Sequence, residues 1–160
     1  MDIFEFAIQM ERDGEAFYRE IAAKTPDKGL QTILLMLAED EQKHARTIQD
    51  MQSQTPEMKA TTVLDTAKNV FVQMKDFGGE IDLSGDEEKL YREAMLIEQR
   101  SISFYLDRAD QVERAEQKVL FHQLAEEEKK HYRLLQDLAE FVKRPKNWLE
   151  NAEFSRFEDY

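Results

Sequence analysis

Two segments of this 160-residue chain repeat the same metal-binding residue types, 87 positions apart. In each copy, one glutamate precedes a Phe-Tyr pair, and a second glutamate begins a Glu-x-x-His motif. The copies together contain six candidate ligands, which are Glu11, Glu41, His44, Glu98, Glu128 and His131. A lone glutamate on one helix and Glu-x-x-His on the next, both duplicated, form the donor set of a carboxylate-bridged two-metal site in a four-helix bundle. The sequence therefore predicts a pair of bound metal ions.

The alternative interpretation is that these motifs lie on a solvated surface. A single Glu-x-x-His motif carries little information in a chain with 34 acidic residues. Here two of the three histidines share the motif, the spacing and the apolar side of a helix, whereas His122 has no repeated partner and is expected to be exposed or structural. Four buried carboxylates would each cost several kcal/mol without compensation. Two divalent cations balance four such charges, so the pattern favours a metal site.

Apolar periodicity predicts an all-α chain whose elements position these residues. We expect residues 1–144 to form a four-helix bundle of two repeated hairpins, at about 2–53 and 84–142. A long crossover at about 54–83 joins them, and residues 145–160 form a C-terminal tail that packs on the bundle or on a subunit contact. The helices are expected at about 2–24, from the Thr25-Pro26-Asp27 break to about 53, at 84–109 and at 113–142, with a further helix possible at 61–75.

The turns of the two hairpins set the heights of the glutamates. Glu11 and Glu41 each lie 15 residues from Pro26, and Glu98 and Glu128 each lie 15 residues from Glu113. Because helices rise by a constant amount per residue, folding at these turns brings each pair to one level. We therefore expect one layer of carboxylates inside the bundle.

Several neighbours of the candidate ligands have more than one interpretation. Tyr18 and Tyr105 each follow a helix glutamate by seven residues. Each is either a core aromatic that needs a hydrogen-bond partner, or a phenol that contacts a ligand carboxylate on a neighbouring helix and could transfer an electron. Gly14 and Ser101 either leave room for dioxygen or peroxide or allow close helix packing. The other nearby acidic residues are expected in solvent, with Glu15 the one candidate for an extra ligand: Glu15, Glu39, Asp40, Glu126 and Glu127.

Composition excludes several classes of function. A net charge of −12 argues against nucleic-acid binding, which needs a cationic surface. The absence of cysteine excludes disulfides and thiolate metal sites. The longest apolar stretch, Ile33 to Ala38, is too short to cross a membrane, and the first residues lack the pattern of a signal peptide. A cytoplasmic protein without a membrane partner is the expectation.

The repeated Glu…Phe-Tyr helix, followed each time by a Glu-x-x-His helix, resembles the rubrerythrin branch of the ferritin-like superfamily. The resemblance covers about residues 3–51 and 91–142. It implies a non-haem centre of two iron ions held by the six candidate ligands, with Glu41 and Glu128 bridging. It also implies an oxidoreductase that reduces peroxide or dioxygen, or oxidises ferrous iron, and that often forms a homodimer.

Two departures from this family pattern affect the expected activity. Rubrerythrins proper carry a four-cysteine rubredoxin domain, so a chain without cysteine is expected to need an external electron-donor protein. They also carry a second glutamate three residues from the one on the third helix, where this chain has Met95 and Ser101 around Glu98. An iron-handling or storage protein, and a helical module with a vestigial metal site, are the alternative functions. Manganese or zinc could replace iron, because mixed imidazole and carboxylate donors suit all three.

Overall fold

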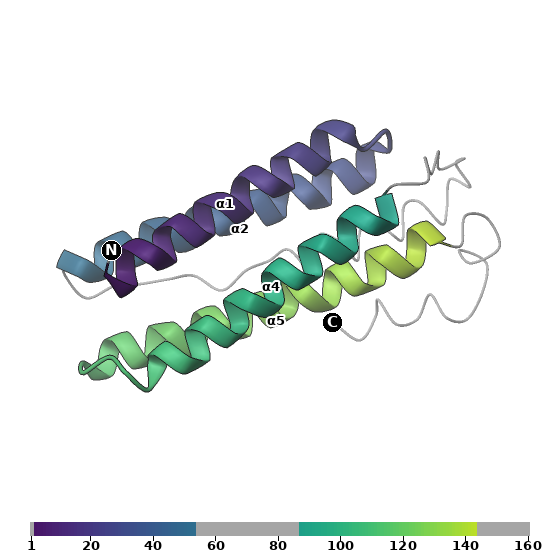
Figure 1. Ribbon diagram of the computed structural model, residues 1–160. Helices are drawn as coiled ribbons and strands as arrows, with labels where there is room; N and C mark the ends of the chain where they lie inside the picture. The colour runs from purple at the N-terminus through teal and green to yellow at the C-terminus, as the bar shows by residue number, and fades with distance from the viewer. Residues whose placement is uncertain (1, 54–86, 144–160) are drawn as a thin grey trace.

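The computed structural model describes residues 2–53 and 87–143, and these two segments are entirely helices and their connections (Figure 1). The described helices are α1 (Ile3–Lys24), α2 (Lys28–Ser53), α4 (Glu87–Ala109) and α5 (Ala115–Lys143). Their ends lie within two residues of the predicted ends wherever both fall in the described segments. The prediction of an all-α, ferritin-like four-helix bundle is confirmed. The predicted crossover helix at 61–75 and the predicted C-terminal tail at 145–160 lie outside the described residues.

Short polar side chains determine where α1 and α2 begin. Asp2 accepts a hydrogen bond from the Glu5 backbone N–H (2.8 Å), and the Glu5 carboxylate accepts one from the Asp2 N–H (3.1 Å), which is a capping box. Asp27 accepts a hydrogen bond from the Leu30 N–H at 2.9 Å and so caps α2. Pro26 therefore lies in the connection rather than in the first turn of a helix.

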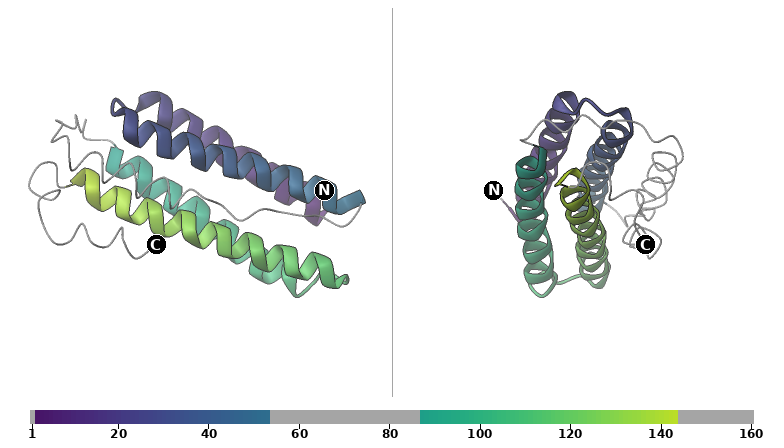
Figure 2. Two further views of the ribbon diagram at one scale, coloured as in Figure 1. Left: turned by 180° about the vertical axis from the view of Figure 1, so that it is seen from behind. Right: turned by 90° about the vertical axis from the view of Figure 1, so that its right-hand side faces the viewer.

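The four helices form two antiparallel hairpins. Helices α1 and α2 pack closely along their length, as do α4 and α5. The two hairpin turns lie at opposite ends of the bundle (Figure 1). Seen nearly end-on, α1 lies beside α4 and α2 lies beside α5 (Figure 2).

Two apolar clusters fill the interior on either side of a polar layer. One lies toward the α1–α2 turn and includes Leu34 and Leu138, and the other lies toward the α4–α5 turn and includes Ile48 and Phe121. All four of these side chains are fully buried. The apolar clusters thus enclose the layer that holds the candidate ligands.

Within the described segments, no helix has the length and apolar character that a bilayer crossing requires.

Candidate metal centre

All six candidate ligands lie in the polar layer, and none is more than 3 % exposed. Each hairpin supplies three of them, a glutamate from its first helix and the Glu-x-x-His pair from its second. They point inward because each lies on the apolar stripe that its helix buries, and the equal distances to the turns place them at one height. The structure therefore brings together every residue that the repeat singled out.

The six side chains form two overlapping groups of four. Glu11 and His44 make one group with Glu41 and Glu128, and within it one ligand atom of each residue lies within 4.8 Å of the others. The second group replaces Glu11 and His44 by Glu98 and His131 and satisfies the same limit. Glu41 and Glu128 are shared. This sharing is the arrangement expected of two carboxylates that bridge two metal positions.

Both imidazole rings turn the same nitrogen toward the carboxylates. His44 Nδ1 lies 2.9 Å from Glu128 Oε1 and 3.4 Å from Glu11 Oε2. His131 Nδ1 lies 2.9 Å from Glu41 Oε1 and 3.4 Å from Glu98 Oε1. The Nδ1 atom of each histidine is therefore the one placed to bind a cation.

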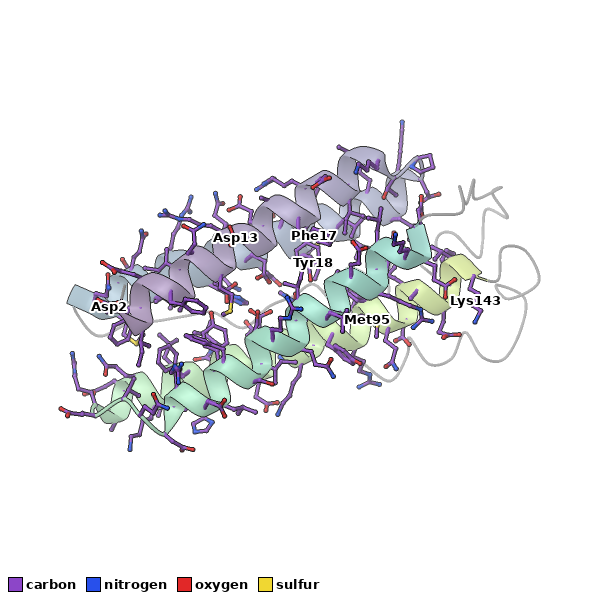
Figure 3. The ribbon with its side chains drawn as sticks, in the orientation of Figure 1. Asp2, Asp13, Phe17, Tyr18, Met95 and Lys143 are labelled. Carbon is purple, nitrogen blue, oxygen red and sulfur yellow. The ribbon has the colours of Figure 1, made fainter. Side chains whose placement is uncertain are left out.

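The two buried tyrosines connect the hairpins reciprocally. Tyr18 on α1 donates a hydrogen bond to Glu98 on α4, and Tyr105 on α4 donates one to Glu11 on α1. Figure 3 shows Tyr18 projecting from α1 toward the second hairpin. Each phenol is a core aromatic with a hydrogen-bond partner, and that partner is a candidate ligand on the other hairpin. The two interpretations of these tyrosines as core aromatics and as contacts of a ligand carboxylate are therefore compatible. Electron transfer by the phenols stays a prediction.

The carboxylates influence one another strongly because they are buried together. Burial, reinforced by neighbouring carboxylates, raises the pKa of Glu41 and of Glu98 well above the ordinary range, and raises that of Glu11 as well. Burial also acts to raise the pKa of Glu128. A hydrogen bond with Glu98 and the charge of His44 outweigh burial there and hold the pKa of Glu128 well below its ordinary value. The side chains by themselves therefore favour a partly protonated layer.

The histidines show the complementary effect. Burial alone would lower the pKa of His44, but Glu11 and Glu128 outweigh it and raise that pKa to about 10. Glu98 and other carboxylates similarly raise the pKa of His131 well above its ordinary value. Positive charge is thus strongly favoured at both ends of the layer.

Unsatisfied buried atoms test whether the layer suits a metal pair. Within the described segments, one oxygen of each of the four glutamates is buried without a hydrogen-bond partner, as is Nδ1 of His131. Such atoms are costly unless something compensates them. Carboxylate oxygens and imidazole nitrogens are donors that iron, manganese and zinc accept, and two divalent cations match four carboxylate charges. The residues fit such a pair.

The comparisons with known proteins agree with this geometry. The family model for rubrerythrin matches residues 2–139. The chain belongs to the rubrerythrin family. Rubrerythrins typically bind iron, and the buried Glu–His cluster of this member is compatible with a metal site.

The other comparisons add the fold alone. No curated protein matches the chain. Among solved structures, a hypothetical protein from Pyrococcus furiosus is similar, with a TM-score of 0.64 and 23% sequence identity. The match covers 92% of this chain and 90% of that one. The two proteins therefore share their architecture over nearly their whole lengths.

The structure also shows rubrerythrin residues that sequence reasoning placed wrongly. Asp40 and Glu127 were expected in solvent, but Glu127 is buried and the Asp40 side chain is only 14% exposed. Asp40 Oδ2 lies 2.8 Å from the Nε2 atom of His131 on the other hairpin. The available signal was the repeat itself, since Asp40 and Glu127 are 87 positions apart and each directly precedes a shared glutamate.

The remaining acidic neighbours follow the predictions more closely. Glu39 and Glu126 are exposed, as expected. Glu15 forms an ion pair with Arg19 at 2.9 Å and is outside both groups of candidate ligands. Within the described segments, no extra carboxylate joins the six.

Gly14 is part of the site because of what lies against it. A Cβ atom at this position would lie 2.9 Å from Glu41 Oε2, closer than real Cβ contacts. The space beside Gly14 is therefore occupied by the Glu41 carboxylate, and the close-packing interpretation holds. Ser101 is the repeat-related residue, and its hydroxyl donates to the Ile97 carbonyl of its own helix at 3.2 Å.

A separate groove of about 1000 Å³ runs along the outside of the α1–α4 seam. Its walls include Met10 and Phe17 from α1 and Ile97 and Phe104 from α4. None of the six candidate ligands lines it. The groove and the buried layer are thus distinct features of this rubrerythrin.

Proposed function

We propose that this rubrerythrin is a di-iron oxidoreductase that reduces peroxide or dioxygen with electrons from an external donor protein. The observation that supports the proposal is the pair of four-residue groups that share Glu41 and Glu128. Two equivalent donor sets with common carboxylates suit two metal ions close together, which is what a two-electron reduction of one small oxidant uses.

Each candidate ligand has a role in this proposal. Glu11 and His44 would hold one iron, Glu98 and His131 the other, and Glu41 and Glu128 both. Bound ferrous iron would supply electrons to the oxidant and regain them from the donor protein. The apolar clusters on either side of the layer exclude competing water.

The tyrosines position the terminal glutamates, which are Glu11 and Glu98, the two that belong to only one group of four each. Burial and the neighbouring carboxylates raise the pKa of Tyr18 and of Tyr105 well above the ordinary value, so each phenol keeps its proton on Oη. That proton is donated to Glu98 in one case and to Glu11 in the other. Each terminal glutamate is thereby held by the opposite hairpin while its other oxygen is available to a cation.

The test is metal analysis of the protein purified from its native host, with ultraviolet–visible spectra before and after addition of peroxide. We expect about two iron ions per chain and an oxo-bridged ferric spectrum that bleaches on reduction. The double variant Glu41→Ala/Glu128→Ala should lose the metal, the spectrum and the consumption of peroxide. The matched control is Glu39→Ala/Glu126→Ala, which removes the same charge from exposed side chains two residues before each shared glutamate.

The alternatives give different results in the same set of experiments. A protein that holds metal but consumes neither peroxide nor dioxygen is a structural or vestigial site, and this outcome overturns the proposal. Two bound manganese ions with catalase activity would replace the iron assignment. A storage cage would elute on gel filtration at the mass of many subunits, whereas we expect a homodimer.

A further inference from the structure

The outer nitrogens of the two histidines meet carboxylates at matching positions of the repeat, but at unequal distances. Asp40 Oδ2 lies 2.8 Å from His131 Nε2 and forms a hydrogen bond with it. Glu127 Oε1 lies 4.0 Å from His44 Nε2, and His44 Nε2 is buried without a hydrogen-bond partner in the described segments. Each of these contacts joins one hairpin to the other. The two halves of the centre therefore differ in how their histidines are held.

Two lysines strengthen this difference. Lys43 Nζ lies 3.8 Å from Asp40 Oδ1 and 3.9 Å from Glu127 Oε1, so it links the two carboxylates. Lys130 Nζ lies 3.8 Å from Glu127 Oε2. Glu127 thus faces an ammonium group on each of its oxygens, whereas Asp40 Oδ1 faces Lys43 and Asp40 Oδ2 bonds to His131. The asymmetry follows from the sequence, because one repeat has Asp and the other Glu at this position.

We propose that Asp40 is a positioning residue that makes the His131 half the tighter of the two metal positions and the first to fill. A carboxylate that accepts the Nε2–H of an imidazole fixes the tautomer in which the Nδ1 lone pair is free for a metal, and it also fixes the ring orientation. His131 has this partner at hydrogen-bond distance, and His44 does not. The inference rests on the proposed function to the extent that both positions must bind cations.

The magnitude follows from what such partners contribute. Loss of a carboxylate that orients a metal-binding histidine lowers metal affinity by about 10- to 100-fold. We therefore expect two separate binding steps for a divalent probe, with dissociation constants that differ by about tenfold or more. Asp40→Asn should weaken the tighter step by about 10- to 100-fold and leave the weaker step nearly unchanged.

The experiment is a titration of the metal-free protein with Co²⁺. Binding is measured by calorimetry and by the visible absorption spectrum of the bound ion. Two backgrounds isolate the halves, since His44→Ala leaves the His131 half and His131→Ala leaves the His44 half. Asp40→Asn should weaken binding in the His44→Ala background and have no effect in the His131→Ala background. Glu39→Gln is the matched control, because it removes a charge from the adjacent exposed residue.

A swap of the two carboxylates provides a second measurement. In Asp40→Glu/Glu127→Asp the tighter step should move to the His44 half. Thermal unfolding of each metal-free variant shows that it is folded, and a purely structural role of Asp40 would lower the stability of the metal-free protein without changing the order of filling. Two equal binding steps in the wild type would overturn this inference alone. A wild-type protein that takes up no Co²⁺ would overturn the proposed function as well.

Discussion

Gly14 provides the sharpest test of the geometry around the shared glutamates. In Gly14→Ala the new Cβ atom would lie 2.9 Å from Glu41 Oε2, whereas ordinary contacts begin near 3.4 Å. The carboxylate must therefore withdraw by about 0.5 Å, which is the difference between these distances. Metal–ligand distances tolerate only about 0.2 Å. Glu41 cannot accommodate the methyl group and keep its place in both proposed metal positions.

The substitution should act with opposite signs on stability and on metal binding. In the metal-free protein the end of the Glu41 side chain can move aside, and alanine is favoured over glycine inside a helix by about 1 kcal/mol. The free energy of unfolding should therefore stay the same or rise by up to about 1 kcal/mol. Cation affinity should fall at least tenfold, which corresponds to a loss of about 1.4 kcal/mol from one displaced ligand.

The assay combines urea denaturation of the metal-free protein with equilibrium dialysis against Mn²⁺. Ser101→Ala is the matched control, because Ser101 is the repeat-related residue and its hydroxyl donates to the carbonyl of Ile97 in the same helix. This control should bind like the wild type. Wild-type affinity in Gly14→Ala would refute the reasoning, as would a loss of more than about 2 kcal/mol of stability in its metal-free form.

Two further predictions concern the tyrosines and pH. Tyr18→Phe and Tyr105→Phe should each lower the free energy of unfolding by about 1–3 kcal/mol, since each leaves a buried glutamate without its hydrogen-bond donor. Urea denaturation measures this loss. Clearly unequal losses in the two variants would contradict the reciprocal arrangement of the two hydrogen bonds. The pKa of His44 is raised from 6.5 to about 10, so its stabilising contribution is complete below pH 6.5 and is lost as pH rises through 10. The raised pKa values of Glu41 and Glu98 act with the same sign, because the folded state holds protons that the unfolded state releases. Thermal melts of the metal-free protein should therefore show that stability falls above pH 6.5, by up to about 5 kcal/mol for His44. Bound cations should remove this pH dependence, because they need deprotonated ligands. A metal-free protein whose stability rises with pH would contradict the prediction.

The fold and the layer of six residues could be predicted from the sequence because both depend on spacing. Helix periodicity identifies the buried face, and the distances from Glu11 and Glu41 to the turn at Pro26 fix their common height. The duplication then predicts that Glu98 and Glu128 form the same arrangement in the second hairpin. Spacing along the chain carries all of this information.

Contacts between the hairpins could not be predicted in this way. Asp40 directly precedes a shared glutamate, so its helix position alone indicates a side chain turned away from the apolar stripe. Only the approach of the second hairpin places His131 Nε2 against it. Gly14 is a similar case, because a small residue is compatible with an open space or with close packing, and the conformation of Glu41 decides between them.

The hydrogen bonds of the polar layer explain why a duplicated hairpin is needed at all. Four hydrogen bonds cross from one hairpin to the other, and they are Tyr18–Glu98, Tyr105–Glu11, His44–Glu128 and His131–Asp40. The closest helix packing, by contrast, lies within each hairpin. A single hairpin would leave two glutamates and one histidine on its apolar face, and burying that face without the partners that compensate them would be strongly unfavourable. Association of the hairpins and assembly of the site are therefore one event, and any cation bound by the shared glutamates stabilises both.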